Sequence, residues 1–188
     1  MSDTDPRDRL RTLRAQIGAL RTEMRTIQTA IEPQSVADYA LATLEGERRL
    51  SSWFCGKRDL IVIHNMGRAC AYCTLWADGF NGVYAHLASR AGFLVTSPDS
   101  PASQDEFAAA RGWRFPMASH AGSTFAADMG YRGAHGWLPG VSVFQQRDGA
   151  LARVSDAAFA PGDDFCAVWH LYDLLPEGAG GWSPRLSY

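Results

Sequence analysis

The feature that most constrains this fold is an alternation of strand-like and helix-like patterns between residues 59 and 97. Two continuous apolar runs have the length and branching of buried strands, DLIVIHNM and AGFLVTS, and the segment between them has a helical pattern, TLWADGFNGVYAHLASR. Strand, helix and strand in this order are typical of a right-handed βαβ unit on a parallel sheet. The helical QDEFAAARG that follows continues the alternation, so we predict an α/β fold.

Two predicted hairpins add antiparallel strands to this unit. The first lies within residues 39–54 around Glu45-Gly46, and the second is LPGVSVFQQRDGALARVS, which turns at Asp148-Gly149. A predicted helix over residues 163–175, DDFCAVWHLYDLL, closes the domain. We therefore expect a mixed central sheet flanked by helices, within one domain of residues 34–178 and followed by a tail of residues 179–188.

The N-terminal residues 1–33 are predicted to form one amphipathic helix, which Pro33 ends. Its apolar residues alternate spacings of three and four, as in a heptad seam: Leu10, Leu13, Ile17, Leu20, Met24, Ile27 and Ile31. Such a seam either pairs two copies of the chain through residues 10–31 or packs the helix on its own domain. The pattern does not decide between a homodimer and this alternative.

Composition and charge exclude several classes of partner. The formal net charge of the 188 residues is −2, which provides no large positive field to hold nucleic acid or an anionic membrane. The charged N-terminus lacks the apolar core of a signal peptide, and no run of about 18 apolar residues could span a bilayer. We expect a cytoplasmic protein, in which four cysteines favour metal binding or transient redox chemistry over structural disulfides.

Two of those cysteines stand two residues apart in RACAYCTLW, between the first strand and its helix. Cys70 is placed at the helix N-terminus, where free N–H groups and the helix dipole favour a thiolate and lower its pKa. Arg68 adds positive charge nearby. One turn deeper, Cys73 can come within disulfide distance of Cys70 and resolve a mixed disulfide that Cys70 has formed.

Other side chains are candidates for the same site. His64, at the end of the strand, could accept the Cys73 proton, or it could be a packed and hydrogen-bonded strand-end histidine. Tyr72, between the cysteines, and Trp113 could contact a substrate, but Trp113 could equally belong to the core. A zinc site lacks a second ligand pair, whereas a copper site of Cys70, Cys73 and a histidine stays possible, so we predict no cofactor but keep a metal carrier as an alternative.

Several longer segments are similar to a known family. The sequence LIVIHNM, the cysteine pair with LWADGF, and then HLASR, RGWRFP, PGVSVFQQRDG and YDLLPEG resemble the bacterial thioredoxin-like family catalogued as domain of unknown function 899, described as predicted dithiol-disulfide oxidoreductases. The likeness covers about residues 36 to 178. It implies a thioredoxin-like sheet with an N-terminal helical extension, and an attacking Cys70 with a resolving Cys73.

The resemblance also implies roles for two other residues. Pro139 corresponds to the cis-proline that faces the active-site disulfide in thioredoxins, although it could also be an ordinary turn proline with a trans bond, and His64 stands at the place of their buried acid. Neither the Trp-Cys-Gly-Pro-Cys motif of thioredoxin nor the Pro-x-x-x-Thr-x-x-Cys motif of peroxiredoxins is present. We predict a thiol-disulfide oxidoreductase for protein or small-molecule disulfides, with a thiol peroxidase and a non-enzymatic copper carrier or interaction module as alternatives.

Overall fold

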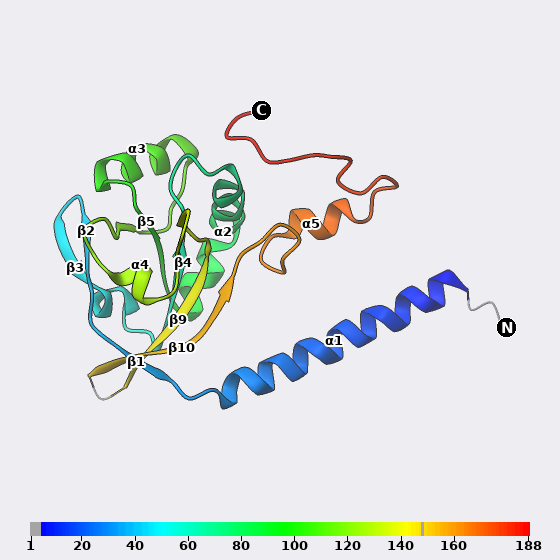
Figure 1. Cartoon of the computed structure of the whole chain (residues 1–188), viewed down its shortest axis with the longest axis horizontal. Helices are drawn as coiled ribbons and strands as arrows, with labels where there is room; N and C mark the ends of the chain where they lie inside the picture. Colours follow the sequence, from blue (N-terminus) through cyan, green and yellow to red (C-terminus); the bar gives the residue numbers. More distant parts are fainter. Residues whose placement is uncertain (1–4, 148) are drawn as a thin grey trace. The chain divides into compact units, whose positions relative to one another are not determined.

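The computed structural model describes residues 5–147 and 149–188, and the chain divides into two compact units, residues 1–33 and 34–188. The first unit consists of helix α1, Pro6–Ala30 (Figure 1). Its N-terminus is capped by the Asp5 carboxylate, which accepts a hydrogen bond from the Arg7 N–H at 2.9 Å, and Pro6 occupies the first turn. The predicted N-terminal helix is confirmed.

The second unit is built on an eight-stranded mixed sheet with the order β1-β10-β9-β4-β5-β6-β2-β3. The central strands β4, β5 and β6 are parallel, and the strand pairs on either side of them are antiparallel. The strands are β1 Gln34–Val36, β2 Ala40–Thr43, β3 Gly46–Arg49, β4 Asp59–His64, β5 Gly92–Ser97, β6 Met117–Ser119, β9 Gly140–Arg147 and β10 Ala150–Ala158.

This arrangement confirms the βαβ unit and both hairpins of the prediction. Gly46 turns the first hairpin with a φ of 110°, a conformation that favours glycine. The second hairpin joins β9 to β10 over eight register pairs, although Asp148 of its predicted turn lies outside the described residues. Strand β1 was not predicted, and it pairs with β10 at the sheet edge.

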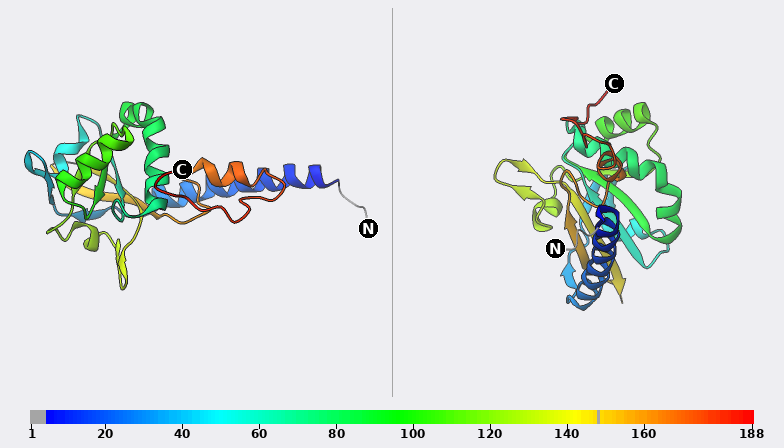
Figure 2. Two further views of the ribbon diagram at one scale, coloured as in Figure 1. Left: turned by 90° about the horizontal axis from the view of Figure 1, so that it is seen from above. Right: turned by 90° about the vertical axis from the view of Figure 1, so that its right-hand side faces the viewer.

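Helices cover both faces of the sheet (Figure 2). The described helices of this unit are α2 Ala71–Arg90, α3 Pro101–Arg111, α4 Phe125–Asp128 and α5 Ala167–Tyr172. The unit also has a 3-10 turn at Leu50–Phe54 and a small hairpin of β7 Arg132–Gly133 and β8 Gly136–Trp137. Among the described residues, none of the helices has the length and apolar character that a membrane crossing requires.

The closing helix α5 is shorter than its predicted span of 163–175. The Asp163 carboxylate accepts hydrogen bonds from the Ala160 and Phe165 N–H groups, which holds residues 160–165 in turns ahead of the helix. At the other end, Pro176 disfavours helical backbone at the residue before it. The hydrogen bonds of Asp163 therefore disfavour helix at the start of the predicted segment, and Pro176 disfavours it at the end.

Two hydrophobic clusters lie on the two faces of the sheet, because successive residues of a strand point to opposite sides. In β4, Leu60 and Val62 pack with Phe125 of α4, whereas Ile63 packs with Trp76 of α2. The β4–α2 connection thus leaves the sheet between the two clusters, at the carboxyl end of the parallel strands. This edge carries the cysteine pair.

Candidate active site

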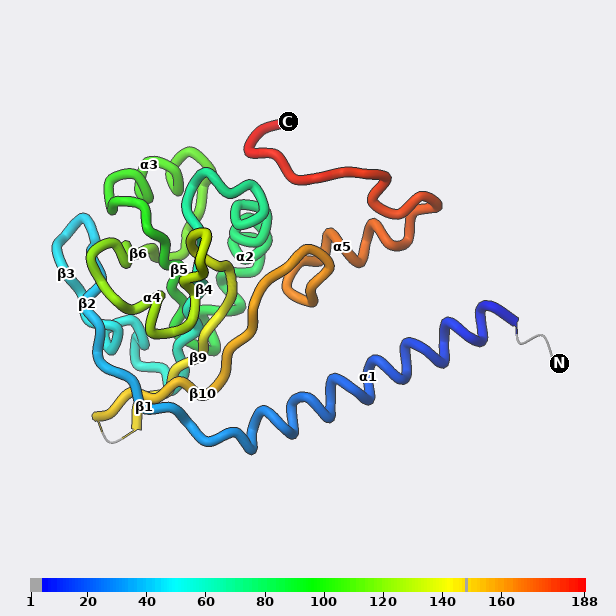
Figure 3. Tube along the Cα trace, viewed as in Figure 1, coloured from blue at the N-terminus to red at the C-terminus, as the bar shows by residue number. Residues whose placement is uncertain are grey.

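Cys70 is the N-cap residue of α2, and it ends the short loop that leaves β4 (Figure 3). Its backbone is extended, and its Sγ accepts a hydrogen bond from the Cys73 N–H at 3.1 Å. The thiol thus takes the place that a serine or aspartate oxygen usually has at a helix start. Because that position favours negative charge, it is suited to a thiolate.

Cys73 lies one turn further along α2 and is only 3% exposed, while Cys70 is half-buried. The Cys73 thiol is a hydrogen-bond partner of Cys70, which together with backbone hydrogen bonds lowers the pKa of Cys70 to about 7 against the opposing effect of burial. The same hydrogen bond and burial raise the pKa of Cys73. Near neutral pH roughly half of the Cys70 thiols are therefore ionised to the thiolate, while Cys73 keeps its proton.

The loop before Cys70 is held by two polar side chains that follow the central strands. Asn65 Oδ1 accepts from the Gly67 N–H at 2.8 Å, and Asp99 Oδ2 accepts from the Arg68 N–H at 2.8 Å. A Cβ at Gly67, whose φ is 109°, would lie 3.1 Å from the Asp99 carboxylate. Sequence reasoning missed Asn65 and Asp99, although both closely follow strands of the parallel pair, where ligand-binding residues gather.

In this hydrogen bond to Asp99, Arg68 uses its backbone N–H and not its guanidinium group. Its predicted stabilisation of the thiolate stays a prediction. The lowered pKa of Cys70 has its described causes in the Cys73 thiol and in backbone N–H groups of the helix start.

His64 ends β4 within the cluster on the α4 side of the sheet. Its ring stacks on Tyr131 at 3.7 Å and on Phe125 at 5.3 Å between centroids, and its Nε2 lies 3.0 Å from Ser142 Oγ. Burial, with the nearby His120 and Arg153, lowers its pKa well below 6.5. The described contacts of His64 do not include a cysteine, and its weakly basic ring is a poor proton acceptor. The role of His64 as acceptor of the Cys73 proton therefore stays a prediction.

Pro139 precedes β9 at the edge of the sheet where the cysteine loop begins, since Gly140 is the register partner of His64. No peptide bond among the described residues is cis. The Leu138-Pro139 bond is therefore trans, and the expectation of a cis-proline is wrong. What Pro139 does contribute is a carbonyl that accepts from the Phe159 N–H at 3.0 Å.

Tyr72 and Trp113 lie in the cluster on the α2 face. The half-buried Tyr72 ring packs between Trp76 and Trp169, 6.4 and 6.2 Å away between centroids. The Trp113 indole N–H donates to Asp78 Oδ1 at 2.8 Å, and Arg111 also bonds this carboxylate. Both side chains are thus fixed by packing, and their contact with a substrate stays a prediction.

A metal site is not formed by the residues that the structure describes. Within these ranges no group of three or more histidine, cysteine, aspartate or glutamate side chains is arranged to hold a metal ion. The alternative copper site of Cys70, Cys73 and a histidine is therefore not assembled. Of the other two cysteines, Cys166 is buried and Cys55 is exposed.

The mixed sheet, with a cysteine pair at the start of the helix after its central strand, defines a thioredoxin-like fold. Solved peroxiredoxins share it: a cysteine-to-serine mutant of peroxiredoxin Q from Xanthomonas campestris matches with a TM-score of 0.54 at 19% identity over 64% of this chain and 80% of that one. Peroxidoxin BcpB of Mycobacterium tuberculosis has a TM-score of 0.55 and 27% identity over 67% and 84% of the two chains. A cysteine-to-serine mutant of PrxQ from Xylella fastidiosa has a TM-score of 0.58 and 16% identity over 69% and 87%.

The chain belongs to the family described as bacterial protein of unknown function (DUF899), which matches residues 9–183. The family resemblance predicted from the sequence is confirmed. The matched range includes most of α1 as well as the sheet domain. None of the curated proteins matches this chain.

Proposed function

We propose that the protein is a thiol-disulfide oxidoreductase whose redox centre is the Cys70-Cys73 pair. One observation carries the proposal: a half-buried Cys70 sulfur with a pKa of about 7 is hydrogen-bonded to a buried Cys73 thiol at a helix start. A pKa near the ambient pH is the optimum for an attacking thiol. The cytoplasm, where such a pair is kept reduced between turnovers, is the compartment that we propose for it.

The reaction transfers two electrons from the pair to a disulfide. The Cys70 thiolate attacks one sulfur of the substrate, a mixed disulfide forms, and the other substrate sulfur leaves as a thiolate that takes up a proton. Cys73 then loses its proton and attacks Cys70 Sγ. The second substrate sulfur leaves as a thiol, and Cys70 and Cys73 are left joined as a disulfide that a thiol reductant returns to the dithiol.

The assignment of roles follows from exposure and charge. Cys70 can be reached by a substrate sulfur, and it carries the negative charge of the reduced pair. Cys73 is covered and protonated, so it reacts only after the first step has removed the charge beside it. The substrate class is a disulfide of a protein or a small molecule.

Replacement of each cysteine tests this proposal with insulin as the disulfide and dithiothreitol as the reductant. Cys70→Ser is expected to lose turnover. Cys73→Ser, mixed with insulin in the absence of dithiothreitol, is expected to accumulate a mixed disulfide that mass spectrometry detects. The matched control is Cys55→Ser, because Cys55 is an exposed cysteine outside the pair. Turnover that survives in Cys70→Ser would remove the proposal.

A thiol peroxidase is the second candidate, and the observation that favours it is the likeness to solved peroxiredoxins. In that reaction the Cys70 thiolate attacks a peroxide oxygen, and water or an alcohol leaves. The resulting sulfenic acid condenses with Cys73 to the disulfide and releases water. The absence of the peroxiredoxin cysteine motif weighs against this activity.

Stopped-flow oxidation of the reduced protein separates the two candidates. For an oxidoreductase we expect hydrogen peroxide to oxidise the pair no faster than it oxidises a peptide thiol, once the thiolate fractions are matched. Oxidation that is orders of magnitude faster in the wild type, and is lost in Cys70→Ser, would establish the peroxidase instead.

A further inference from the structure

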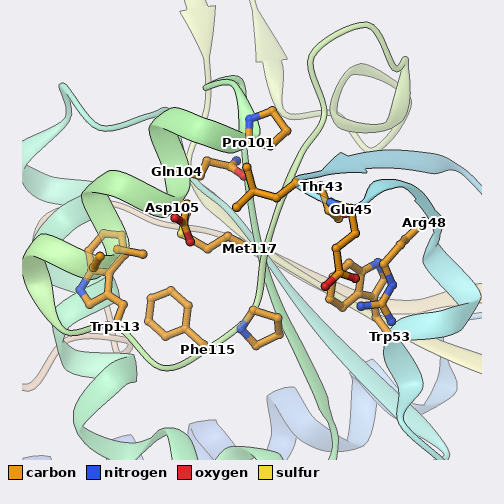
Figure 4. Close-up of a pocket in the computed structure, with 14 residues that line it drawn as sticks. Thr43, Glu45, Arg48, Trp53, Pro101, Gln104, Asp105, Trp113, Phe115 and Met117 are labelled. Atoms are coloured by element: carbon orange, nitrogen blue, oxygen red, sulfur yellow. Dashed lines mark hydrogen bonds between the residues drawn. The ribbon is translucent and has the colours of Figure 1, made fainter.

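The second unit contains a cavity of about 450 Å³ that neither cysteine of the pair lines. It lies between α3 and the β2–β3 hairpin, and residues 113–117 leading into β6 form its floor (Figure 4). This volume is within the range of small-molecule sites. The cavity therefore has room for a compact organic ligand.

Most of the wall is apolar and aromatic. Trp113, Phe115 and Met117 line the floor, and Trp53 lines the side of the hairpin. The Trp113 ring is anchored by its hydrogen bond to Asp78 and packs on Phe115 at 5.2 Å between centroids. An apolar ligand body would meet a surface that is already in place, so little ordering of side chains would oppose binding.

The charged groups are few, and they lie at two opposite walls. Asp105 reaches toward the cavity from α3, and Glu45 reaches toward it from the hairpin, as Figure 4 shows. Among the described residues that line the cavity, the one cation is Arg48, whose guanidinium is drawn onto the face of Trp53, 3.9 Å from the ring centroid. Two carboxylates and one guanidinium give these walls a formal charge of −1.

We propose that this cavity binds a small organic cation, a protonated amine on an apolar body. The apolar part would pack on Trp113, Phe115 and Met117, and the ammonium group would bond Asp105 or Glu45. A neutral ligand would gain no charge-assisted hydrogen bond from these exposed carboxylates, and an anion would be repelled by them.

This site is separate from the redox chemistry, but its wall reaches the cysteine loop. Buried Gln104 lines the cavity and donates to Ser97 Oγ at 2.8 Å. Ser97 Oγ in turn donates to Asp99 Oδ2 at 3.1 Å, the oxygen that accepts from the Arg68 N–H. The proposal does not depend on disulfide turnover, and it can be tested in Cys70→Ser.

Binding is measured by calorimetry with 2-phenylethylamine as the cation, 2-phenylethanol as its neutral counterpart and 3-phenylpropionate as the anion. The change in tryptophan fluorescence reports the same event, since Trp53 and Trp113 line the cavity. We expect saturable binding of the amine at least about tenfold tighter than that of the alcohol, because a charge-assisted hydrogen bond is lost in the alcohol. No binding of the carboxylate is expected.

Charge-removing variants locate the site. The variant that removes the carboxylate bonded to the ammonium group, Asp105→Asn or Glu45→Gln, is expected to weaken binding of the amine about tenfold. Their matched controls are Glu106→Gln on α3 and Glu47→Gln on β3, neighbouring carboxylates that do not line the cavity. Circular dichroism verifies the fold of each variant.

Four results would overturn the proposal. Three of them are no saturable binding of the amine up to about 10 mM, the weak end of useful affinities; equal affinity for the amine and the alcohol; and losses of affinity in the control variants as large as those in Asp105→Asn and Glu45→Gln. An unchanged affinity in folded Asp105→Asn and Glu45→Gln would likewise place the amine elsewhere.

Discussion

Helix α1 has the more regular pattern of apolar residues, whereas helix α2 buries more of its side chains. Helix α1 has 25 residues and an unbroken alternation of apolar residues from Leu10 to Ile27, yet no side chain of it is buried, and Met24 of its seam is 65% exposed. Helix α2 has 20 residues, a weak apolar pattern and two glycines, Gly79 and Gly82, yet it buries Cys73, Thr74, Trp76 and Ala77.

The difference separates two sources of helix stability. A regular apolar stripe indicates that one side of a helix packs against another surface, but it does not identify that surface. Glycines weaken a helix by about 1 kcal/mol each relative to alanine, and α2 is stabilised instead by packing on the sheet. The cysteine pair lies at the start of α2, the helix whose position the tertiary structure determines.

The largest expected effect is on the packing of α2. Trp76 is 2% exposed, contacts Phe159 and donates to Asp163, so Trp76→Ala should lower the free energy of unfolding by about 3–5 kcal/mol. The control in α1, Leu20→Ala, removes a side chain that is 57% exposed and should leave the unfolding of the sheet domain nearly unchanged. Urea denaturation measures both. Equal losses in the two variants would refute the contrast between the helices.

The next effect is on the stability of the sheet domain at acid pH. Helix α1 contains no histidine, so the buried histidines act in the sheet domain alone. Burial lowers the pKa of His120 from 6.5 to about 4, and burial likewise lowers that of His64. Between pH 6.5 and 4 each of these histidines binds a proton in the unfolded chain but not in the folded chain. The free energy of unfolding therefore decreases as the pH is lowered. For His120 the loss is roughly 3 kcal/mol, complete near pH 4.

Urea midpoints between pH 7.5 and 4 would measure this loss. His120→Asn removes one of the two titrating groups and should make the profile shallower, with His64 still contributing, whatever the effect of the substitution on stability at neutral pH. A wild-type midpoint that stays constant down to pH 4 would show that the buried histidines are not responsible.

A smaller effect concerns the partner of α1. We propose that α1 pairs with α1 of a second copy through the seam of residues 10–31. Leu20→Glu removes about 1 kcal/mol of apolar burial from each of the two copies, about 2 kcal/mol per dimer, which should raise the dimer dissociation constant roughly thirtyfold. Ala15→Glu, at a position outside the seam, is the control, and sedimentation velocity is the measurement. A monomeric wild type would favour packing of α1 on its own domain.

The smallest expected effect is on the reactivity of Cys70 at the start of α2. In a Cys55→Ser background, the rate of alkylation of Cys70 should rise with pH around about 7, the pKa of this thiol. Cys73→Ala removes the S–H donor but keeps the N–H groups of the helix start. The midpoint should therefore move up by about one pH unit, equivalent to about 1.4 kcal/mol. An unmoved midpoint would assign the lowered pKa to the helix start alone.

Much of the fold could be predicted because its signals are local. The apolar runs of β4 and β5, the glycine turn at Gly46 and the seam of α1 each indicate their element within a few residues. Strand β1 could not be predicted, because three mostly exposed residues carry no periodicity and become a strand only by pairing with β10.

The candidate site divides in the same way. The spacing of Cys70 and Cys73 and their place before a helix are local properties, and they were sufficient to predict which cysteine caps the helix. The contacts of His64, Asn65 and Asp99 depend on which face of the sheet each side chain meets and on which strands are neighbours. Those relations join residues far apart in the chain.

By itself, then, the sequence determined the order of the βαβ unit and of the two larger hairpins, and the pair of sulfur atoms at a helix start, since backbone propensity and side-chain spacing act over a few residues. Only the tertiary structure decided that Cys73 is covered while Cys70 is reachable, that the Leu138-Pro139 bond is trans, and that a cavity forms beside α3. Burial, charge and cavity shape arise from segments brought together by packing, and no local pattern encodes them.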